Sequence, residues 1–417
     1  SDSLQHNMFV LDGIEFNIWF QGECKPVWPN LIGDFFIFIN EQFVMMKDPA
    51  VEIYHFIFQI LSCKFHHGVE HLNSTVIVLG PSYDLMKGEL YDDLLSVSSH
   101  ELFHSWNIKT IRPVEMMPYD YIKENYSRLG YVCEGVTTYY GDLLLFRSGV
   151  FSEYDYFKTV YQHLQKHFDN FGRFNLSVAD ASFDTWLDGY VPGIPNRKTS
   201  IYTEGALTAF MTDMLIRKHS ENKNSLDDVM RYLYFEYGKH QKGYSEADYK
   251  SIVEQTAGVK LDDFFNTYVY AANSYDEGLR DALHHIGCEL KTGASKKYHE
   301  RFLGFKVAEE GGSTKITSIY PDSIADVAQL SAGDEIVAVN NNQIKGNLPN
   351  GAAGFERMCR YFYDEKITLT VSSNGVNRKT SLAPSKEEFY KIYFIEKNPE
   401  ATEEQKNSFR LWSKRAF

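Results

Sequence analysis

The chain has 417 residues, 43% of them apolar and 15% aromatic, which is enough to build more than one hydrophobic core. Its net charge of −14 argues against a nucleic-acid partner, because such binding needs concentrated Lys and Arg. No stretch offers the about 18–20 uninterrupted apolar residues of a membrane span. Five cysteines without metal-type spacing argue against a complete disulfide framework. We expect a soluble protein, and the compartment stays open between cytoplasm, periplasm and secretion.

The first 80 residues alternate between strand and helix patterns. Residues 14–20 predict a strand, residues 30–46 an amphipathic helix, and the apolar run 51–61 a buried strand. A further strand is expected over residues 68–79. It carries Glu70.

Residues 100–104 read His-Glu-Leu-Phe-His and are the most informative part of the sequence. Positions four apart lie on one face of a helix, so His100 and His104 can reach a single cation. Zn²⁺ is bound by imidazole nitrogen at about 2.0–2.1 Å. Glu101 is suited to act as a general base on zinc-bound water. The alternative is a chance match on an ordinary buried helix, and the scarcity of His in this chain disfavours it.

A third metal ligand is expected downstream of the two histidines. Glu134 lies in the first turn of an apolar segment that runs to Phe146 and stops at Ser148-Gly149. A buried carboxylate there is costly unless it is paired or bound to metal. The alternative reading of Glu134 is a solvated helix residue.

Residues 94–286 are mainly helical in pattern, with a capping box at 225–228 and a helix start at 245–248 that ends before Gly258. Tyr202 precedes a helix whose apolar residues recur at three- and four-residue spacing: Ala206, Leu207, Phe210, Met211, Met214 and Leu215. Its hydroxyl is a candidate neutral donor to a developing oxyanion. The alternative is a packing tyrosine.

Composition shifts near residue 287, and short strands are expected over residues 315–319 and 335–339. Before them stands Leu303-Gly304-Phe305. This part resembles a PDZ domain, whose apolar-Gly-apolar loop turns backbone N–H groups toward a peptide C-terminal carboxylate. The alternative is a PDZ fold that serves only for packing.

The run HELFHSWNIKTIRP at 100–113, followed by NYSRLGYVCEGVTTYYGDLLLFRSG at 125–149, resembles the glycyl aminopeptidase family of gluzincin zinc peptidases. Residues 66–75 resemble that family's substrate strand. Residues 179–186 and 202–207 match two further segments. The resemblance covers essentially the whole chain, in the family's order.

The resemblance implies roles for single residues. His100, His104 and Glu134 take the zinc-ligand places, and Glu101 takes the general-base place. Tyr202 takes the place of a tyrosine that donates to the oxyanion in related aminopeptidases.

The substrate strand is implied to contribute Gly68, Val69 and Glu70, with Glu70 binding the free α-amine of the substrate. Two positions depart from the family pattern. Glu204 replaces a lysine near the oxyanion tyrosine, and His67 replaces a glycine of the substrate strand.

The implied fold class is α+β: a thermolysin-like catalytic domain, with a mixed sheet and a mainly helical lobe, followed by a β-rich PDZ domain. Because the chain begins without Met, we expect it to be processed or truncated. The resemblance then implies that residues 1–22 are the end of a missing N-terminal β-domain or its junction. The catalytic domain is expected at 23–286, a linker at 287–299, the PDZ domain at 300–385 and a C-terminal helical tail at 386–417.

The sequence therefore predicts a zinc-dependent aminopeptidase with one zinc per chain, which removes small N-terminal residues from peptides with Glu101 as general base. Its expected partners are peptides with a free N-terminus and a peptide C-terminus at the PDZ groove. Two alternatives remain open: a zinc endopeptidase with PDZ-mediated substrate recruitment, and a non-catalytic PDZ adaptor.

Overall fold

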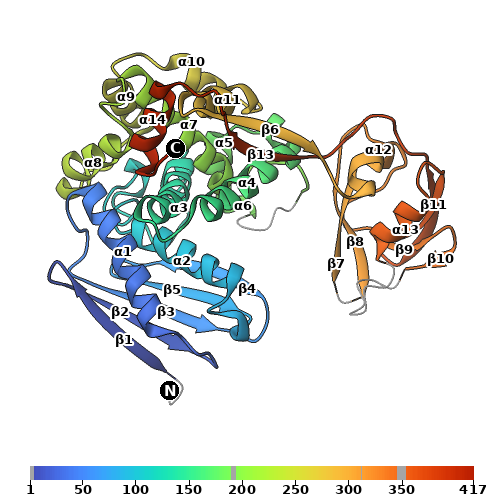
Figure 1. The fold of residues 1–417 in the computed structure, drawn as a ribbon, viewed down its shortest axis with the longest axis horizontal. Coiled ribbons are helices and arrows are strands. Elements are labelled where there is room, and N and C mark those ends of the chain that lie inside the picture. Colours follow the sequence, from blue (N-terminus) through green and yellow to red (C-terminus); the bar gives the residue numbers. More distant parts are fainter. Residues whose placement is uncertain (1–3, 189–193, 311, 345–353) are drawn as a thin grey trace. The chain divides into compact units, whose positions relative to one another are not determined.

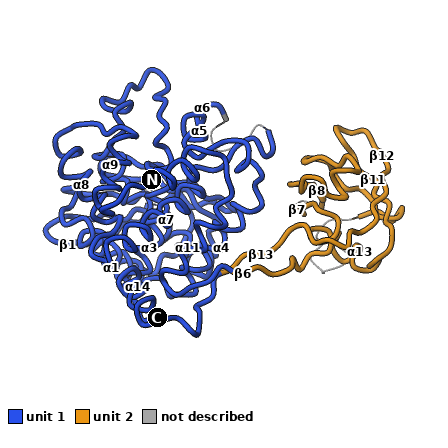
Figure 2. Tube along the Cα trace, turned by 90° about the horizontal axis from the view of Figure 1, so that it is seen from above, with its two compact units in different colours: residues 1–290, 395–417 blue, residues 291–394 orange. Residues whose placement is uncertain are grey.

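Two units make up the computed structural model, which describes residues 4–188, 194–310, 312–344 and 354–417. Figure 2 colours the two units separately. Unit 1 comprises residues 1–290 and 395–417, and unit 2 comprises residues 291–394. Unit 2 is thus inserted in the sequence of unit 1.

Unit 1 contains a five-stranded mixed sheet in the order β1-β2-β3-β5-β4 (Figure 1). Strands β2, β3 and β5 run parallel, while β1 and β4 are antiparallel to their neighbours. Asp12 and Gly13 both have positive φ and form the tight turn between β1 and β2. The strands are β1 Gln5–Leu11, β2 Ile14–Gln21, β3 Ile53–Ile60, β4 Phe65–Glu70 and β5 Ser74–Gly80.

The strands predicted at 14–20 and 51–61 are confirmed as β2 and β3. The single strand predicted at 68–79 is wrong, because the chain reverses between β4 and β5. The His71 N–H donates to the carbonyl of Ser74 at 2.8 Å, which closes a turn in this polar stretch. The reversal makes β4 an edge strand, and Glu70 is its last residue.

Two helices pack on this sheet. Helix α1 (Trp28–Met46) connects β2 to β3 and buries Phe35, Phe38 and Phe43 against it, which confirms the amphipathic helix. Helix α2 (Gly88–Phe103) contacts β4, β5 and α1, so both helices cover the same face. Helix α2 therefore holds residues 100–104 beside the edge strand β4.

The remainder of unit 1 is a helical lobe. Capping boxes at Ser225–Asp228 and Ser245–Asp248 begin α8 and α9, and Gly258 ends α9 with φ of 76°, as predicted. Across the described residues, no helix is long and apolar enough to cross a membrane. The helices are α3 Thr137–Ser148, α4 Glu153–Asp169, α5 Val178–Phe183, α6 Thr185–Asp188, α7 Ile201–His219, α8 Leu226–Glu236, α9 Glu246–Ala257, α10 Asp262–Phe264 and α11 Asp276–His285.

A last helix, α14 (Glu403–Ser413), belongs to unit 1 although it follows unit 2 in the sequence. The Trp412 indole is buried and its Nε1–H donates to the hydroxyl of Tyr139 at 2.9 Å. The Arg147 Nε–H donates to the Trp412 carbonyl at 2.7 Å. Both partners lie on α3, so α14 closes the core of the helical lobe.

Unit 2 is a β-rich unit with an antiparallel sheet in the order β12-β11-β9-β8-β7, in which β10 pairs with β9. Its core includes Leu303, Phe305 and Phe355. The strands predicted at 315–319 and 335–339 are confirmed. The elements are β7 Phe305–Glu310, β8 Ser313–Ile319, α12 Ile324–Val327, β9 Glu335–Val339, β10 Asn342–Gln343, α13 Phe355–Tyr361, β11 Ile367–Ser373 and β12 Val376–Leu382.

Three terminal and connecting segments contain strands. Residues 1–22 contain β1 and β2 of the unit 1 sheet. Residues 287–299, expected as a linker, contain β6 (Cys288–Ala294), which buries Cys288 and Leu290. Its partner β13 (Lys391–Lys397) lies in the expected helical tail. The chain passes between the two units within these two strands.

Candidate metal centre and active site

His100 and His104 lie one turn apart at the end of α2. His104 follows the last residue of the helix but keeps helical φ and ψ of −59° and −20°, so the i, i+4 spacing still aligns the two rings. Their Nε2 atoms are 3.0 Å apart. The Nδ1–H of His104 donates to the carbonyl of Asn107 at 2.9 Å. That hydrogen bond fixes the ring and leaves Nε2 facing the site, as is typical of metal-binding histidines.

Glu134 comes from a π-helical turn, Tyr131–Val136, that leads into α3. Such turns are rare and occur frequently at functional sites. The Asn107 side chain donates to the carbonyls of Val132 and Cys133 at 2.8 and 3.2 Å. One residue thus ties the loop after α2, which holds His104, to the turn that holds Glu134.

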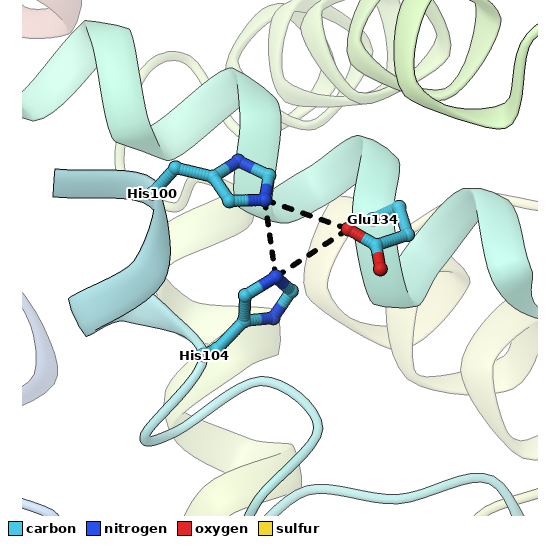
Figure 3. A group of neighbouring side chains, drawn as sticks. All are labelled: His100, His104 and Glu134. Carbon is cyan, nitrogen blue, oxygen red and sulfur yellow. Dashed lines mark hydrogen bonds and ion pairs between the residues drawn. The ribbon is translucent and has the colours of Figure 1, made fainter. Parts of the chain in front are cut away.

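The three side chains converge, as Figure 3 shows. The Oε2 atom of Glu134 is 3.5 Å from Nε2 of His100 and 3.4 Å from Nε2 of His104. Ligands bound at about 2.0–2.1 Å in a tetrahedral arrangement are separated by about 3.3 Å. The set His100, His104 and Glu134 therefore has both the ligand types and the spacing for one Zn²⁺.

The buried oxygens of the site also fit a bound metal. Oε2 of Glu134 and Oε2 of Glu101 are buried, and neither accepts a hydrogen bond from any described residue. Burial opposes charge on both members of the His104–Glu134 pair, but their mutual attraction dominates. It raises the pKa of His104 to about 9 and, with His100, holds the pKa of Glu134 far below its usual range. A cation between these groups would satisfy the same carboxylate.

Glu101 is 5% exposed and lies between α2 and the edge strand. A Cβ on Gly68 would lie 2.2 Å from Oε1 of Glu101, so a larger residue at this position would push the carboxylate aside. Burial raises the pKa of Glu101, and the nearby His100 and His104 offset this only in part. A raised pKa brings a carboxylate closer to the range in which a general base is effective.

Glu70 joins the site from β4. One of its oxygens lies within 4.8 Å of ligand atoms of Glu101 and His104. Its Oε1 also accepts a hydrogen bond from Nζ of Lys109 at 2.9 Å. Burial raises the pKa of Glu70, but the His104 and Lys109 charges outweigh it and lower the pKa below the usual value. The Glu70 carboxylate is thus ionised and already paired.

Tyr202 lies in the first turn of α7, which begins after the N-cap Ser200. Its ring centroid is 6.3 Å from that of His100, so the tyrosine borders the proposed ligand set. Glu204, the departure from the family's lysine, is buried. Its Oε2 is 2.7 Å from Nδ1 of His167, whose Nε2 accepts from the backbone N–H of Tyr275 at 3.2 Å. The Glu204 carboxylate, which stands where the family has a lysine, is therefore paired with His167 in the interior.

The remaining predicted site residues are Val69 and the loop Leu303-Gly304-Phe305. Val69 is on β4 with an exposed side chain. In unit 2, Leu303 and Phe305 are buried core residues. The Gly304 N–H already donates to the carbonyl of His299 at 2.9 Å. That N–H is therefore already engaged.

Sequence reasoning missed Lys109 and Asn107. Both stand within five residues of His104, in the HSWNIKTIRP run. That proximity is the one signal that could have drawn attention to them. Neither contact could be inferred from it, because Glu70 and the π-helical turn are distant in sequence.

The M61 glycyl aminopeptidase family matches residues 93–208 of this chain, and the PDZ domain family matches residues 294–352. The matched segment 93–208 contains His100, Glu101, His104, Glu134 and Tyr202. The chain is a peptidase, and a PDZ domain follows its catalytic region. The α+β architecture with a β-rich PDZ domain is confirmed.

The crystal structure of an aminopeptidase N family protein from Idiomarina loihiensis is similar, with 26% identity and a TM-score of 0.86. The match covers 98% of this chain and 70% of that chain. A mutant M1 zinc metallopeptidase from Deinococcus radiodurans, bound to a Tyr-Ser-Ala substrate, has 12% identity and a TM-score of 0.42. That match covers 65% of this chain and 52% of the other. No curated protein matches the chain.

Proposed function

We propose that this chain is a zinc-dependent aminopeptidase that removes small N-terminal residues, such as glycine or alanine, from peptides, with one zinc per chain. The observation that carries the proposal is the convergence of His100, His104 and Glu134 beside the partnerless Oε2 of Glu101. The M61 match over the same residues supports it.

His100, His104 and Glu134 would hold the zinc, leaving one position open. Bound zinc would supply a Lewis acid that polarises the scissile carbonyl and lowers the pKa of water. Glu101 takes the proton from the attacking water and passes it to the leaving amine. Its burial, which raises its pKa, suits both transfers.

Other residues of this chain would bind and orient the peptide. The free edge of β4, with Gly68 and Val69, can add the peptide backbone as a further strand. Glu70, at the end of that strand, would accept the α-ammonium group. Tyr202 would donate a hydrogen bond to the oxyanion that forms at the carbonyl.

A side-chain survey with amino-acid anilides tests the proposal on the zinc-loaded protein. Glycine and alanine anilides should be cleaved, a chelator should stop the reaction, and added zinc should restore it. N-acetylated anilides should be poor substrates. Cleavage of neither series, at full zinc occupancy, would contradict the proposal.

A zinc endopeptidase remains the second candidate, because Glu70 is already paired with Lys109 and is not a free acceptor for an amine. Equal cleavage of free and N-acetylated peptides would favour it. A non-catalytic PDZ adaptor requires a lost catalytic set, whereas His100, Glu101, His104 and Glu134 are all present and lie close together here.

A further inference from the structure

Lys109 is held at the site by an unusual backbone conformation. Ile108, the residue before it, has φ of 114°, a value that disfavours a β-branched side chain. Two hydrogen bonds hold the loop in this conformation. The Ile108 N–H donates to the carbonyl of Ile111 at 3.1 Å, and Arg112 Nε–H donates to the carbonyl of Ile108 at 3.0 Å. Strained residues of this kind cluster at functional sites.

This loop places the Lys109 ammonium in an ion pair with the carboxylate of Glu70. The two charged groups are 2.9 Å apart, and their side chains are 22% and 27% exposed. The same carboxylate lies within 4.8 Å of ligand atoms of Glu101 and His104. The ion pair is therefore next to two of the residues that would act on the peptide.

We propose that Lys109 is a specificity-determining residue. Its ammonium is paired with the Glu70 carboxylate in the free enzyme, and the α-ammonium of a substrate must displace it. This inference rests on the proposed function, in which Glu70 binds the substrate's amine. Lys109 and the α-ammonium carry the same charge and seek the same acceptor, so they compete.

The competition sets how strongly the enzyme distinguishes free from blocked N-termini. A free amine binds Glu70 only after breaking the Lys109 pair, which weakens its binding. A peptide with a blocked N-terminus leaves the pair intact and thus avoids the cost of a half-buried, unpaired carboxylate. Lys109 therefore lowers the preference for free amines below what Glu70 alone would give.

The test is Lys109→Met, which keeps the side chain's length and removes its charge. The probes are alanine hydroxamate and N-acetylalanine hydroxamate, which are not cleaved and whose binding to zinc-loaded protein is measured by calorimetry. Because a partly exposed ion pair is worth little, the variant should bind the free-amine probe about two- to fivefold tighter. It should bind the acetylated probe more weakly.

Two control variants accompany the test. Lys109→Arg retains the charge and should keep the parent's ratio of affinities. Lys250→Met removes a lysine that is also 22% exposed and ion-paired, with Asp262 and Glu254, and it should change neither affinity. In a Glu70→Gln background, Lys109→Met should no longer alter the ratio.

The outcomes separate the inference from the function it rests on. If Lys109→Met weakened the binding of both probes equally, or changed neither affinity, the inference would be overturned. Lys109 would then be a structural support of the loop. If the zinc-loaded parent bound neither probe, the proposed function would fail, and the inference with it. Anilide cleavage by the parent remains an independent check on the function.

Discussion

Gly135 and Gly205 approach each other backbone to backbone. A Cβ on Gly205 would lie 2.6 Å from Cα of Gly135 and 2.7 Å from the carbonyl oxygen of Tyr131. One glycine is in the π-helical turn of Glu134, and the other is three residues after Tyr202. This contact therefore sets the distance between a proposed metal ligand and the proposed oxyanion donor.

Gly205→Ala should force α7 away from the π-helical turn. Overpacking of this kind typically costs about 1–3 kcal/mol of unfolding free energy, and zinc affinity should fall with it. Denaturant unfolding and zinc titration measure the two effects. Gly33→Ala is the matched control, because Gly33 is in a helix with nothing within 4 Å of its Cβ position. It should be neutral or stabilising by about 0.5–1 kcal/mol.

Glu101→Gln should keep the metal and lose turnover. The three proposed ligands are untouched, while the proton acceptor is gone, so kcat should fall by about 10²–10⁴. Metal content and anilide cleavage are measured on the same preparation. Near-full turnover in this variant would show that another group accepts the proton.

Zinc uptake at pH 7 should release about one proton. In the metal-free protein the Glu134 carboxylate raises the pKa of His104 to about 9, so its imidazole is protonated at pH 7 and must lose that proton to bind metal. Apparent zinc affinity should accordingly rise with pH up to about 9 and then level off. Calorimetry in buffers of different ionisation enthalpy counts the protons. His104→Ala should release fewer protons and bind zinc more weakly.

Tyr202→Phe should lower kcat and leave KM nearly unchanged. Loss of one preorganised oxyanion donor typically costs on the order of 10²–10³ in kcat. Steady-state kinetics with alanine anilide separates the two constants. A rise in KM alone would assign Tyr202 to binding or packing instead.

Glu70→Ala should lower kcat/KM on free-amine substrates and leave it nearly unchanged on N-acetylated ones. A charge-assisted hydrogen bond is worth about 1.5–3 kcal/mol, so kcat/KM on free-amine substrates should fall about ten- to a hundredfold. The unpaired Lys109 would add repulsion. N-acetylated analogues should change little. Equal loss on both types would mean that Glu70 supports the fold or the metal.

Local features of the site could be predicted from the sequence because they depend on neighbours in the chain. The i, i+4 spacing places His100 and His104 on one face, and the apolar segment that starts near Glu134 ends at Gly149, which has φ of 93°. The strands β2 and β3 and the capped helices follow from the same short-range patterns.

Contacts between distant segments could not be predicted in this way. The pairing of Lys109 with Glu70 depends on a positive φ at Ile108, which β-branched residues rarely adopt. The prediction of one strand over 68–79 was wrong because the chain reverses in a turn closed by the His71 N–H hydrogen bond to Ser74. The roles of the ligands, of Glu101 and of Tyr202 remain predictions for the experiments above.

The insertion of unit 2 into unit 1 orders events during synthesis. Helix α14, with Trp412 bonded to Arg147 and Tyr139, leaves the ribosome only after the whole PDZ domain. Until then the helical lobe lacks the helix that closes its core. The core of unit 1 is consequently incomplete for as long as the PDZ domain is being made.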